Sequence, residues 1–175
     1  MTAGKNHCEW EGVWCNNSDE YVDQLGLDGN KLTGPIPECI GDLVNLYSLF
    51  LDVNELTGGP IPESIGDLVV NLQQLSLSLN QFTGPIPDSI GNLVNLESLD
   101  LGLNQLTGPI PEAIGNLVNL RGLYLDGNEL TGPIPKSILN MVNLRYLYLN
   151  SNQLDPTPEW LKKFCESRTT LDCYF

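Results

Sequence analysis

Few side chains in this sequence could take part in acid–base or nucleophilic chemistry. The only histidine is His7, close to the N-terminus, where chains commonly fray. Glu97 and Asp100 form a carboxylate pair, and such pairs hydrolyse glycosidic bonds when a pocket raises the pKa of one partner. We expect this pair on a solvated strand without such a pocket, and the GxxxxGK motif that cradles phosphate does not occur. The sequence therefore predicts no enzyme, no cofactor and no metal site.

The five cysteines form two close pairs and one single residue. Cys8 and Cys15 lie near the N-terminus, Cys165 and Cys173 lie near the C-terminus, and Cys39 stands alone between them. Neither pair has the CxxC spacing that is typical of zinc sites. Pairs at the two ends of a chain are typical of disulfides that close the exposed ends of a core, which favours an oxidising compartment. We therefore expect two terminal disulfides, a free Cys39, and a protein that is secreted or lies on the extracellular face of the cell surface.

Acidic residues dominate the charge of the chain. The 22 Asp and Glu residues outnumber the 8 Lys and Arg residues and give a net charge of −14. Residues 1–100 alone carry a net charge of −13. This excess argues against binding to nucleic acid, which needs a basic surface, and favours a basic partner toward the N-terminal half. No apolar stretch is long enough to cross a bilayer, so we expect no direct insertion into a membrane.

The sequence repeats itself at an interval of about 24 residues. One asparagine marks each copy of the unit LxxLxLxxNxLTGPIPxxIGxLVN: Asn30, Asn54, Asn80, Asn104, Asn128 and Asn152. One interval is 26 residues long because it contains two single insertions, Gly59 and Val70. The units start near residues 22, 46, 72, 96, 120 and 144. We expect six stacked coils over residues 22–155, an N-terminal cap over residues 1–21 and a C-terminal cap over residues 156–175.

Each part of the unit predicts its own structure. The LxL segment alternates apolar and polar residues like a half-buried strand, so its leucines should point inward. Successive coils then pair their strands in parallel, and the rest of the unit provides the long return connection. The repeated Asn can donate two hydrogen bonds and accept others, so stacked copies form a ladder that satisfies buried turn backbone groups. The prolines of the return segment predict extended or irregular backbone with at most one short helical turn.

The return segment also carries a resemblance. The motif LxGxIP occurs five times, as LTGPIP, LTGGPIP or FTGPIP, and residues 8–15 read CEWEGVWC. Over about residues 8–155 the chain resembles the plant-type leucine-rich repeat family. The resemblance implies an α/β repeat solenoid: a right-handed superhelix with a parallel concave β-sheet, an irregular convex side and cysteine-paired caps. It also implies a recognition role, as in receptor-kinase ectodomains and polygalacturonase-inhibiting proteins.

Side chains that point outward from the strands are free of the core and are candidates for binding a protein or peptide partner. They are Arg121, Tyr124, Arg145, Tyr146 and Tyr148, with Tyr47, Phe50 and Asp100 as further candidates. Tyr124, Tyr146 and Tyr148 lie on neighbouring predicted strands, and Tyr and Arg are enriched at binding hot spots. The alternative is that these rings pack across the strands and only shield the leucines beneath them.

The residue before the ladder Asn forms a second column of interest. It is apolar in three neighbouring coils, as Val53, Leu79 and Leu103. These side chains could form an exposed apolar strip, which would mark a contact surface, or fold back onto neighbouring coils.

Two further columns bear on other functions. Asp28, Asp52 and Asp126 share one position, but Ser78 and Gly102 interrupt the column, so we expect a solvated acidic face and not a calcium site. A regular threonine column on the flank raises ice binding as another class of function: Thr33, Thr57, Thr83, Thr107 and Thr131.

Together these features predict a non-catalytic recognition module that binds a protein or peptide through its strand face. The alternatives are an inhibitor of a cell-wall-degrading enzyme and an ice-binding or surface-binding protein that uses the threonine flank.

Overall fold

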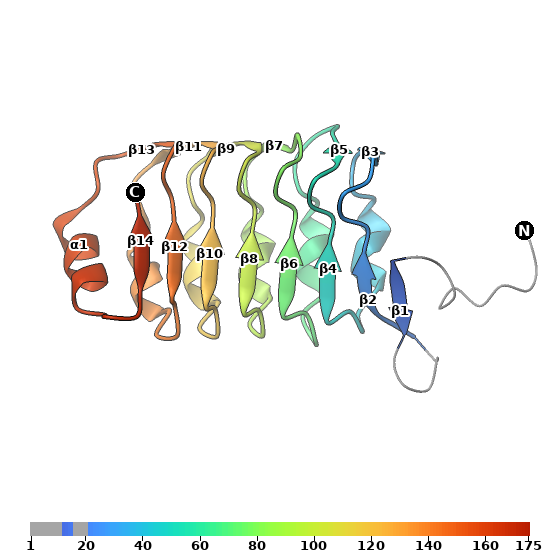
Figure 1. Ribbon diagram of the computed structural model, residues 1–175, viewed down its shortest axis with the longest axis horizontal. Coiled ribbons are helices and arrows are strands. Elements are labelled where there is room, and N and C mark those ends of the chain that lie inside the picture. The colour runs from blue at the N-terminus through green and yellow to red at the C-terminus, as the bar shows by residue number, and fades with distance from the viewer. Residues whose placement is uncertain (1–11, 16–20) are drawn as a thin grey trace, which may run out of the picture.

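The computed structural model describes residues 12–15 and 21–175. Within them, a main sheet of eight strands runs along the molecule, with its strands side by side (Figure 1). Each of the six coils contributes one strand, and the segments before and after the coils contribute one each. In spatial order these are β1 (Val13–Cys15), β2 (Val22–Gly26), β4 (Ser48–Phe50), β6 (Gln74–Ser76), β8 (Ser98–Asp100), β10 (Gly122–Tyr124), β12 (Tyr146–Tyr148) and β14 (Asp172–Tyr174). β1 and β2 are antiparallel, and the other neighbours pair in parallel. The predicted repeat solenoid with a parallel sheet is therefore confirmed.

The first leucine of each LxL segment, which is the middle residue of its strand, lies in the same register from coil to coil. Leu49 lies opposite Leu75, and the same pairing continues through Leu99 and Leu123 to Leu147. Each of these five side chains is at most 1% exposed. The register is kept across the 26-residue interval, so the two insertions are accommodated outside the main strands. Burial of this apolar face requires neighbouring coils, because one coil alone would leave it in water.

A second set of short strands follows the ladder asparagines along the upper rim of the molecule (Figure 1). It comprises β3 (Thr33–Gly34), β5 (Glu55–Leu56), β7 (Thr83–Gly84), β9 (Gln105–Gly108), β11 (Glu129–Gly132) and β13 (Gln153–Leu154). The sequence predicted extended or irregular backbone here but did not predict that the coils would pair. Among the described residues the set divides into β3-β5 and β7-β9-β11-β13. The division falls at the inserted Gly59, whose carbonyl accepts the Thr83 N–H at 3.2 Å.

Short 3-10 turns lie behind the main sheet (Figure 1). They are η2 (Glu38–Asp42), η3 (Glu63–Asp67), η4 (Asp88–Asn92), η5 (Glu112–Asn116) and η6 (Lys136–Asn140). Each begins directly after the second proline of PxP, as the prediction of one short helical turn requires. The turns stack closely: a Cβ on Gly66 would lie 2.5 Å from the Ser89 carbonyl oxygen. A side chain at this glycine would therefore push neighbouring coils apart.

The ladder asparagines join each coil to the one before it. The Asn104 amide donates to the carbonyl oxygens of Leu77, Leu101 and Gly102, each at 3.1 Å. Its oxygen accepts the Phe82 N–H at 3.1 Å. Asn54, Asn80, Asn128 and Asn152 make the same set of bonds in their own coils. Asn30 is exposed, and within residues 12–15 and 21–175 its amide donates to carbonyls of its own coil alone, those of Leu27 and Asp28.

A second asparagine column, which was not predicted from the sequence, also links the coils. It lies along the lower rim, where each coil leads from its 3-10 turn into its strand of the main sheet (Figure 1). The Asn95, Asn119 and Asn143 amides donate to the Val70, Val94 and Val118 carbonyls at 2.9–3.1 Å. Arg168 takes the corresponding place in the C-terminal cap, where its Nη1 donates to the Met141 and Val142 carbonyls at 3.1 Å. The cap thus continues the interaction that the coils use with one another.

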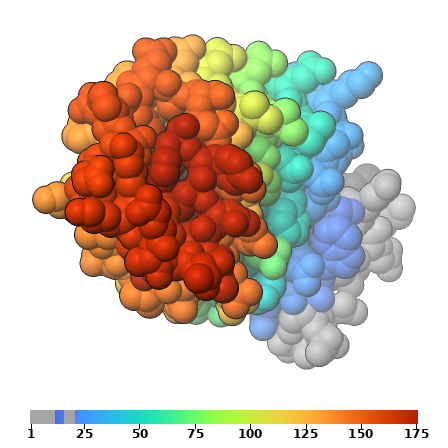
Figure 2. All heavy atoms as spheres, turned by 60° about the vertical axis from the view of Figure 1, so that its left-hand side comes forward, coloured from blue at the N-terminus to red at the C-terminus, as the bar shows by residue number. Residues whose placement is uncertain are grey.

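The C-terminal residues close the end of the solenoid (Figure 2). Helix α1 (Glu159–Glu166) buries Leu161 and Phe164, and a disulfide joins Cys165 to Cys173. Cys15 is also disulfide-bonded, and its expected partner, Cys8, lies outside the described residues. Cys39 is free, as expected, and it is exposed. The small residues at the same position of the other coils, Ser64, Ser89, Ala113 and Ser137, favoured a half-buried side chain there, and that interpretation is wrong.

The ladder geometry predicts how its members differ in stability. Asn104→Ala would leave three carbonyls and one N–H without partners in a buried turn, so we expect it to cost about 1–3 kcal/mol of unfolding free energy. Asn152→Ala, in a turn that is only partly buried, should cost less because water can replace the amide. Urea denaturation followed by circular dichroism measures both. Equal losses, or no loss at Asn104, would contradict a stabilising role for the buried ladder.

Candidate partner-binding site

Four tyrosines meet on the last three strands of the main sheet, on the solvent-facing side, which is opposite the buried leucines. We call them the tyrosine patch: Tyr124, Tyr146, Tyr148 and Tyr174. The rings of Tyr124 and Tyr148 make an edge contact with centroids 5.2 Å apart, and Tyr148 contacts Tyr174 in the same way at 4.6 Å. Tyr146 stacks against Tyr124 at 6.2 Å. The structure therefore brings together the three tyrosines that the sequence singled out.

Tyr174 was missed because it belongs to the cap and not to a repeat. Strand β14 pairs with β12 so that Cys173 lies opposite Leu147 and Tyr174 opposite Tyr148. The segment Asp172–Tyr174 thus serves as another outward–inward–outward strand, with a cysteine in place of the inward leucine. Extending the strand pattern by one coil into the cap would have identified it.

Gly122 determines how the Tyr124 ring lies. A Cβ on Gly122 would be 2.7 Å from Cε2 of Tyr124, so the ring lies directly over this glycine. The repeat has Ser98 and Tyr146 in the aligned positions of the neighbouring strands, and either residue at 122 would displace the ring. Gly122 is therefore a positioning residue of the patch that the sequence analysis did not assign to it.

The phenols of Tyr124 and Tyr148 stay neutral over the physiological pH range. Burial, followed by the neighbouring Tyr148 and Tyr146 hydroxyls and Asp100, raises the pKa of Tyr124 above its ordinary value. Burial, followed by Tyr174 and Asp172, likewise raises the pKa of Tyr148. The hydroxyls are therefore available as hydrogen-bond donors, at the edge of an otherwise aromatic surface.

The two arginines differ in their availability. Arg121 forms an ion pair with Glu97 at 3.1 Å, and both side chains are exposed, so solvent screens the pair. Arg145 makes no ion pair with any residue in the described part of the chain and is exposed. It lines a hollow of about 440 Å³ together with Arg168, Ser167, Thr169 and Thr170. This exposed cation directly precedes Tyr146 in the sequence.

The other three candidates lie in different places. Asp100 is opposite Tyr124 across the β8–β10 pair, so it borders the patch. Tyr47 is exposed just before β4, and Phe50 is half-buried at the end of that strand. Strands β6 and β8 separate β4 from β10, so Tyr47 and Phe50 do not join the patch.

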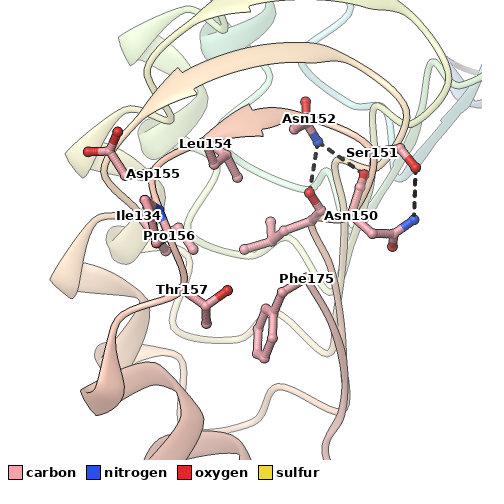
Figure 3. Close-up of a pocket in the computed structure, with 10 residues that line it drawn as sticks. Ile134, Asn150, Ser151, Asn152, Leu154, Asp155, Pro156, Thr157 and Phe175 are labelled. Carbon is pink, nitrogen blue, oxygen red and sulfur yellow. Dashed lines mark hydrogen bonds between the residues drawn. The ribbon is translucent and has the colours of Figure 1, made fainter.

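A hollow of about 250 Å³ lies between the last coil and the C-terminus (Figure 3). Phe175 and Leu154 contribute its apolar part, and Asn150, Ser151 and Thr157 contribute polar groups. Because Phe175 directly follows Tyr174, the hollow adjoins the strand that carries the end of the patch.

Two searches of the described residues bear on other roles. Across residues 12–15 and 21–175, His, Cys, Asp and Glu side chains form no group of three that could hold a metal ion. Over the same residues, no helix has the length and apolar character needed to span a membrane.

Known proteins share this architecture. The leucine rich repeat family matches residues 22–43, 70–130 and 111–154. The LRR receptor-like serine/threonine-protein kinase SIK1 of Oryza sativa subsp. japonica is 46% identical over 54 residues, which are 31% of this chain and 6% of that kinase. The match thus spans only a small part of the curated relative.

Two solved structures match most of the chain. One is the BIR3–SERK2 complex from Arabidopsis thaliana, with a TM-score of 0.79 and 33% identity over 90% of this chain and 82% of the matched one. The other is a plant ice-binding protein, with a TM-score of 0.80 and 37% identity over 86% of this chain and 48% of that one. The fold is thus that of a leucine-rich repeat solenoid closed by a disulfide-bonded cap. The chain belongs to the plant-type leucine-rich repeat family and resembles its receptor ectodomains.

The environment of Asp100 predicts a pH-dependent change in stability. Burial, and then the charges of Asp126 and Asp52, raise the pKa of Asp100 above its ordinary value, although the Gly102 N–H and Ser78 donate to it. The folded state therefore disfavours the ionised carboxylate, and stability falls as pH rises through the raised pKa. Asp100→Asn keeps an oxygen for the Gly102 N–H and should increase the unfolding free energy at pH 7.

This gain should disappear near pH 3, where Asp100 is protonated in both the folded and the unfolded chain. Urea denaturation at the two pH values measures it. Asp42→Asn, at an exposed carboxylate of η2, controls for the general benefit of removing one charge from an acidic protein. A gain at Asp100 no larger than at Asp42, or one that persists at low pH, would contradict the assignment.

Proposed function

We propose that this chain is a non-catalytic recognition module that binds a protein or peptide partner through the tyrosine patch. The observation that carries the proposal is the contact between four outward-facing tyrosines on three adjacent strands. Arg145, which forms no ion pair with the described residues, lies beside them. Tyrosine and arginine side chains supply much of the binding energy at protein interfaces.

The position of the rings argues against a role in shielding the core. Side chains alternate between the two faces of a strand, so Tyr124 and Leu123 lie on opposite faces of the main sheet. Leu123 and Leu147 are 0% exposed because they pack inside the solenoid. Tyr146 and Tyr174 are 42% and 54% exposed. The rings therefore do not cover the leucines, which favours binding over the packing alternative.

Mutual packing also favours binding for an entropic reason. Tyr124 and Tyr148 are each held by neighbouring rings, so a partner would not need to immobilise them. Ordering a free side chain at an interface costs about 0.5–1.5 kcal/mol, which a preorganised patch avoids. The hollow beside Phe175 offers an adjacent place for a side chain of the partner.

The relatives support the same reading at a coarser level. The matched BIR3–SERK2 structure is a complex of two proteins, and SIK1 is a receptor-like kinase. Together with the disulfides at Cys15 and Cys165–Cys173, this supports an extracellular domain. Inhibition of a cell-wall-degrading enzyme is a narrower form of the proposal, in which a basic target meets the acidic N-terminal half.

Substitution of the patch tests the proposal. Binders are first selected on the wild-type protein from a displayed library of random peptides, and affinities are then measured by biolayer interferometry. Tyr124→Ala with Tyr148→Ala should weaken the selected peptides by about ten-fold or more, which corresponds to about 1.4 kcal/mol. The thermal midpoint should change little, because the leucines on the other face remain packed.

Tyr47→Ala is the matched control, since it truncates an exposed tyrosine that lies outside the patch. We expect binding by this variant to equal that of the wild type. A loss at Tyr47 as large as that at the patch, or no loss at the patch, would contradict the proposal.

Ice binding is a second candidate, favoured by the 37% identity to a solved plant ice-binding protein. The threonine column lies on or beside the second set of strands, where Thr33, Thr83 and Thr131 are exposed. Neighbouring strands are about 4.8 Å apart, so the column is regularly spaced wherever the strands pair. The break between β5 and β7 interrupts it at Gly59.

An ice-recrystallisation assay separates the two candidates. If the flank binds ice, the wild-type protein should restrain crystal growth, and Thr83→Lys with Thr107→Lys should abolish the effect while peptide binding by the patch persists. If the wild-type protein leaves crystal growth unchanged, ice binding is ruled out.

A further inference from the structure

Three neighbouring coils place an aliphatic residue in a backbone conformation that such residues avoid. Val53, Leu79 and Leu103 have φ angles of 55°, 53° and 53°. A positive φ brings Cβ close to the backbone and is unfavourable for aliphatic residues, most of all β-branched ones, whereas glycine and, to a lesser extent, asparagine tolerate it. Strained residues of this kind persist only where the surrounding structure enforces them.

Hydrogen bonds between coils enforce this conformation. The Val53 N–H donates to the Ser78 carbonyl, the Leu79 N–H to Gly102 and the Leu103 N–H to Asp126, at 2.8–3.1 Å. The ladder asparagine follows directly and fixes the turn from its other side. The fold therefore requires a left-handed residue at this position.

The fold does not require an aliphatic one. Two other coils have glycine here, Gly29 and Gly127, with φ angles of 64° and 65°, and another has Ser151. Glycine adopts this conformation without steric cost. The three central coils thus depart from the residue that would suit their own backbone, which indicates that the side chains serve another purpose.

These side chains are not used to build the core. Val53, Leu79 and Leu103 are 48%, 47% and 51% exposed. Leu103 partly folds onto the next coil, since a Cβ on Gly127 would lie 2.6 Å from its Cδ2, yet half of it still faces solvent. We call these three residues the rim strip.

The strip runs along the upper rim of the solenoid. Its residues lie in the β4–β5, β6–β7 and β8–β9 connections, which run side by side from the main sheet to the second set of strands (Figure 1). The coils that carry it precede those of the tyrosine patch, which belongs to β10, β12 and β14. The strip and the patch therefore share no residue, although Leu103 reaches Gly127 in the coil of β10.

The charge around the strip is strongly negative. Residues 21–120 contain a single cation, Lys31, against 12 acidic residues. Asp52 directly precedes Val53, and Asp100 and Asp126 both lie beside Gly102, where a Cβ would be 3.3 Å and 3.2 Å from their Oδ1 atoms. Repulsion from Asp126 and Asp52 contributes to the raised pKa of Asp100, so these carboxylates share one negative potential.

We propose that the rim strip is a second interaction surface, which binds a basic amphipathic helix of a partner protein. The apolar face of the helix covers Val53, Leu79 and Leu103, and its Lys or Arg residues meet the neighbouring aspartates. The spacing favours a helix over an extended segment. Adjacent coils are about 4.8 Å apart, and helical residues three or four apart advance about 4.5–6 Å, whereas same-face residues of a strand are about 6.6 Å apart.

A second copy of this chain does not fit the surface. Each copy carries a net charge of −14, and pairing two strips would bring the aspartate groups of both copies together. Like charges placed opposite one another disfavour association. The partner is therefore a different, basic chain.

The test uses a fluorescein-labelled peptide of leucine and lysine with its leucines at helix spacing, and fluorescence anisotropy. The variant Leu79→Asn with Leu103→Asn removes half-exposed aliphatic groups and introduces a residue that tolerates positive φ. We expect it to weaken peptide binding by at least about ten-fold. Its thermal midpoint should equal or exceed that of the wild type.

The chain offers a matched control. Val94 and Val118 are 46% and 43% exposed on the lower rim, before the strands of the main sheet instead of after them, and neither has a positive φ. Val94→Asn with Val118→Asn should leave binding unchanged, and so should Tyr124→Ala with Tyr148→Ala. If the asparagine variant of the strip melts early, Leu79→Gly with Leu103→Gly replaces it, because sister coils already carry glycine there.

Several results would overturn the proposal. One is undiminished binding by a folded strip variant, and another is an equal loss in the lower-rim control. A third is equal binding of a peptide of the same composition whose leucines alternate with lysines, which would indicate charge attraction without helix recognition. A dimer in sedimentation velocity that the strip variant abolishes would assign the surface to a second copy instead. Loss of binding in the tyrosine variant alone would assign the peptide to the patch.

Discussion

The hydrogen bonds of the ladder asparagines are the interaction on which the rest of this structure depends. Stacked coils bury turn backbone on both sides, and a buried carbonyl or N–H without a partner costs about 1–3 kcal/mol. One amide per coil satisfies three carbonyls and one N–H, as at Asn104. The same bonds set the distance between coils, so they also determine which outward side chains become neighbours. The edge contact between Tyr124 and Tyr148 follows from this stacking.

The ladder also has a cost, which falls on the residue before each asparagine. The turn that aims the amide inward forces that residue to a positive φ, so glycine is the least costly choice, as at Gly127. Any other residue at this position is less favourable for the backbone than glycine, and the fold tolerates it. In a repeat whose core positions are nearly invariant from coil to coil, such departures carry more information than the repeat itself. Both candidate surfaces are departures of this kind: aromatic residues where the middle coils have Ser or Asp, and aliphatic residues where sister coils have glycine.

The sequence predicted the main strands, their parallel pairing and the asparagine positions, because each depends only on the period and on residue type. It did not predict the pairing of the second set of strands, since the LxGxIP motif does not show which coils pair there or that the inserted Gly59 separates β5 from β7. Tyr174 was not predicted as part of the patch because it lies in the C-terminal cap, where the repeat pattern no longer applies. The positive φ of Leu79 was not predicted either. A sequence pattern indicates which side chains are exposed or charged, but this backbone angle depends on the hydrogen bond from the Leu79 N–H to the next coil.

The two insertions bear on the choice between the proposed functions. Gly59 lies between β5 and β7, and Val70 lies before β6, so neither interrupts the main sheet, where Leu49 still pairs with Leu75. A surface that binds a protein needs continuity only over its own few coils, and the tyrosine patch lies wholly beyond both insertions. A surface that matches a crystal lattice needs regular spacing over its whole length, and the threonine flank loses that regularity at Gly59. The placement of the insertions therefore leaves the strand face intact and interrupts the flank, which favours recognition of a partner over binding to ice.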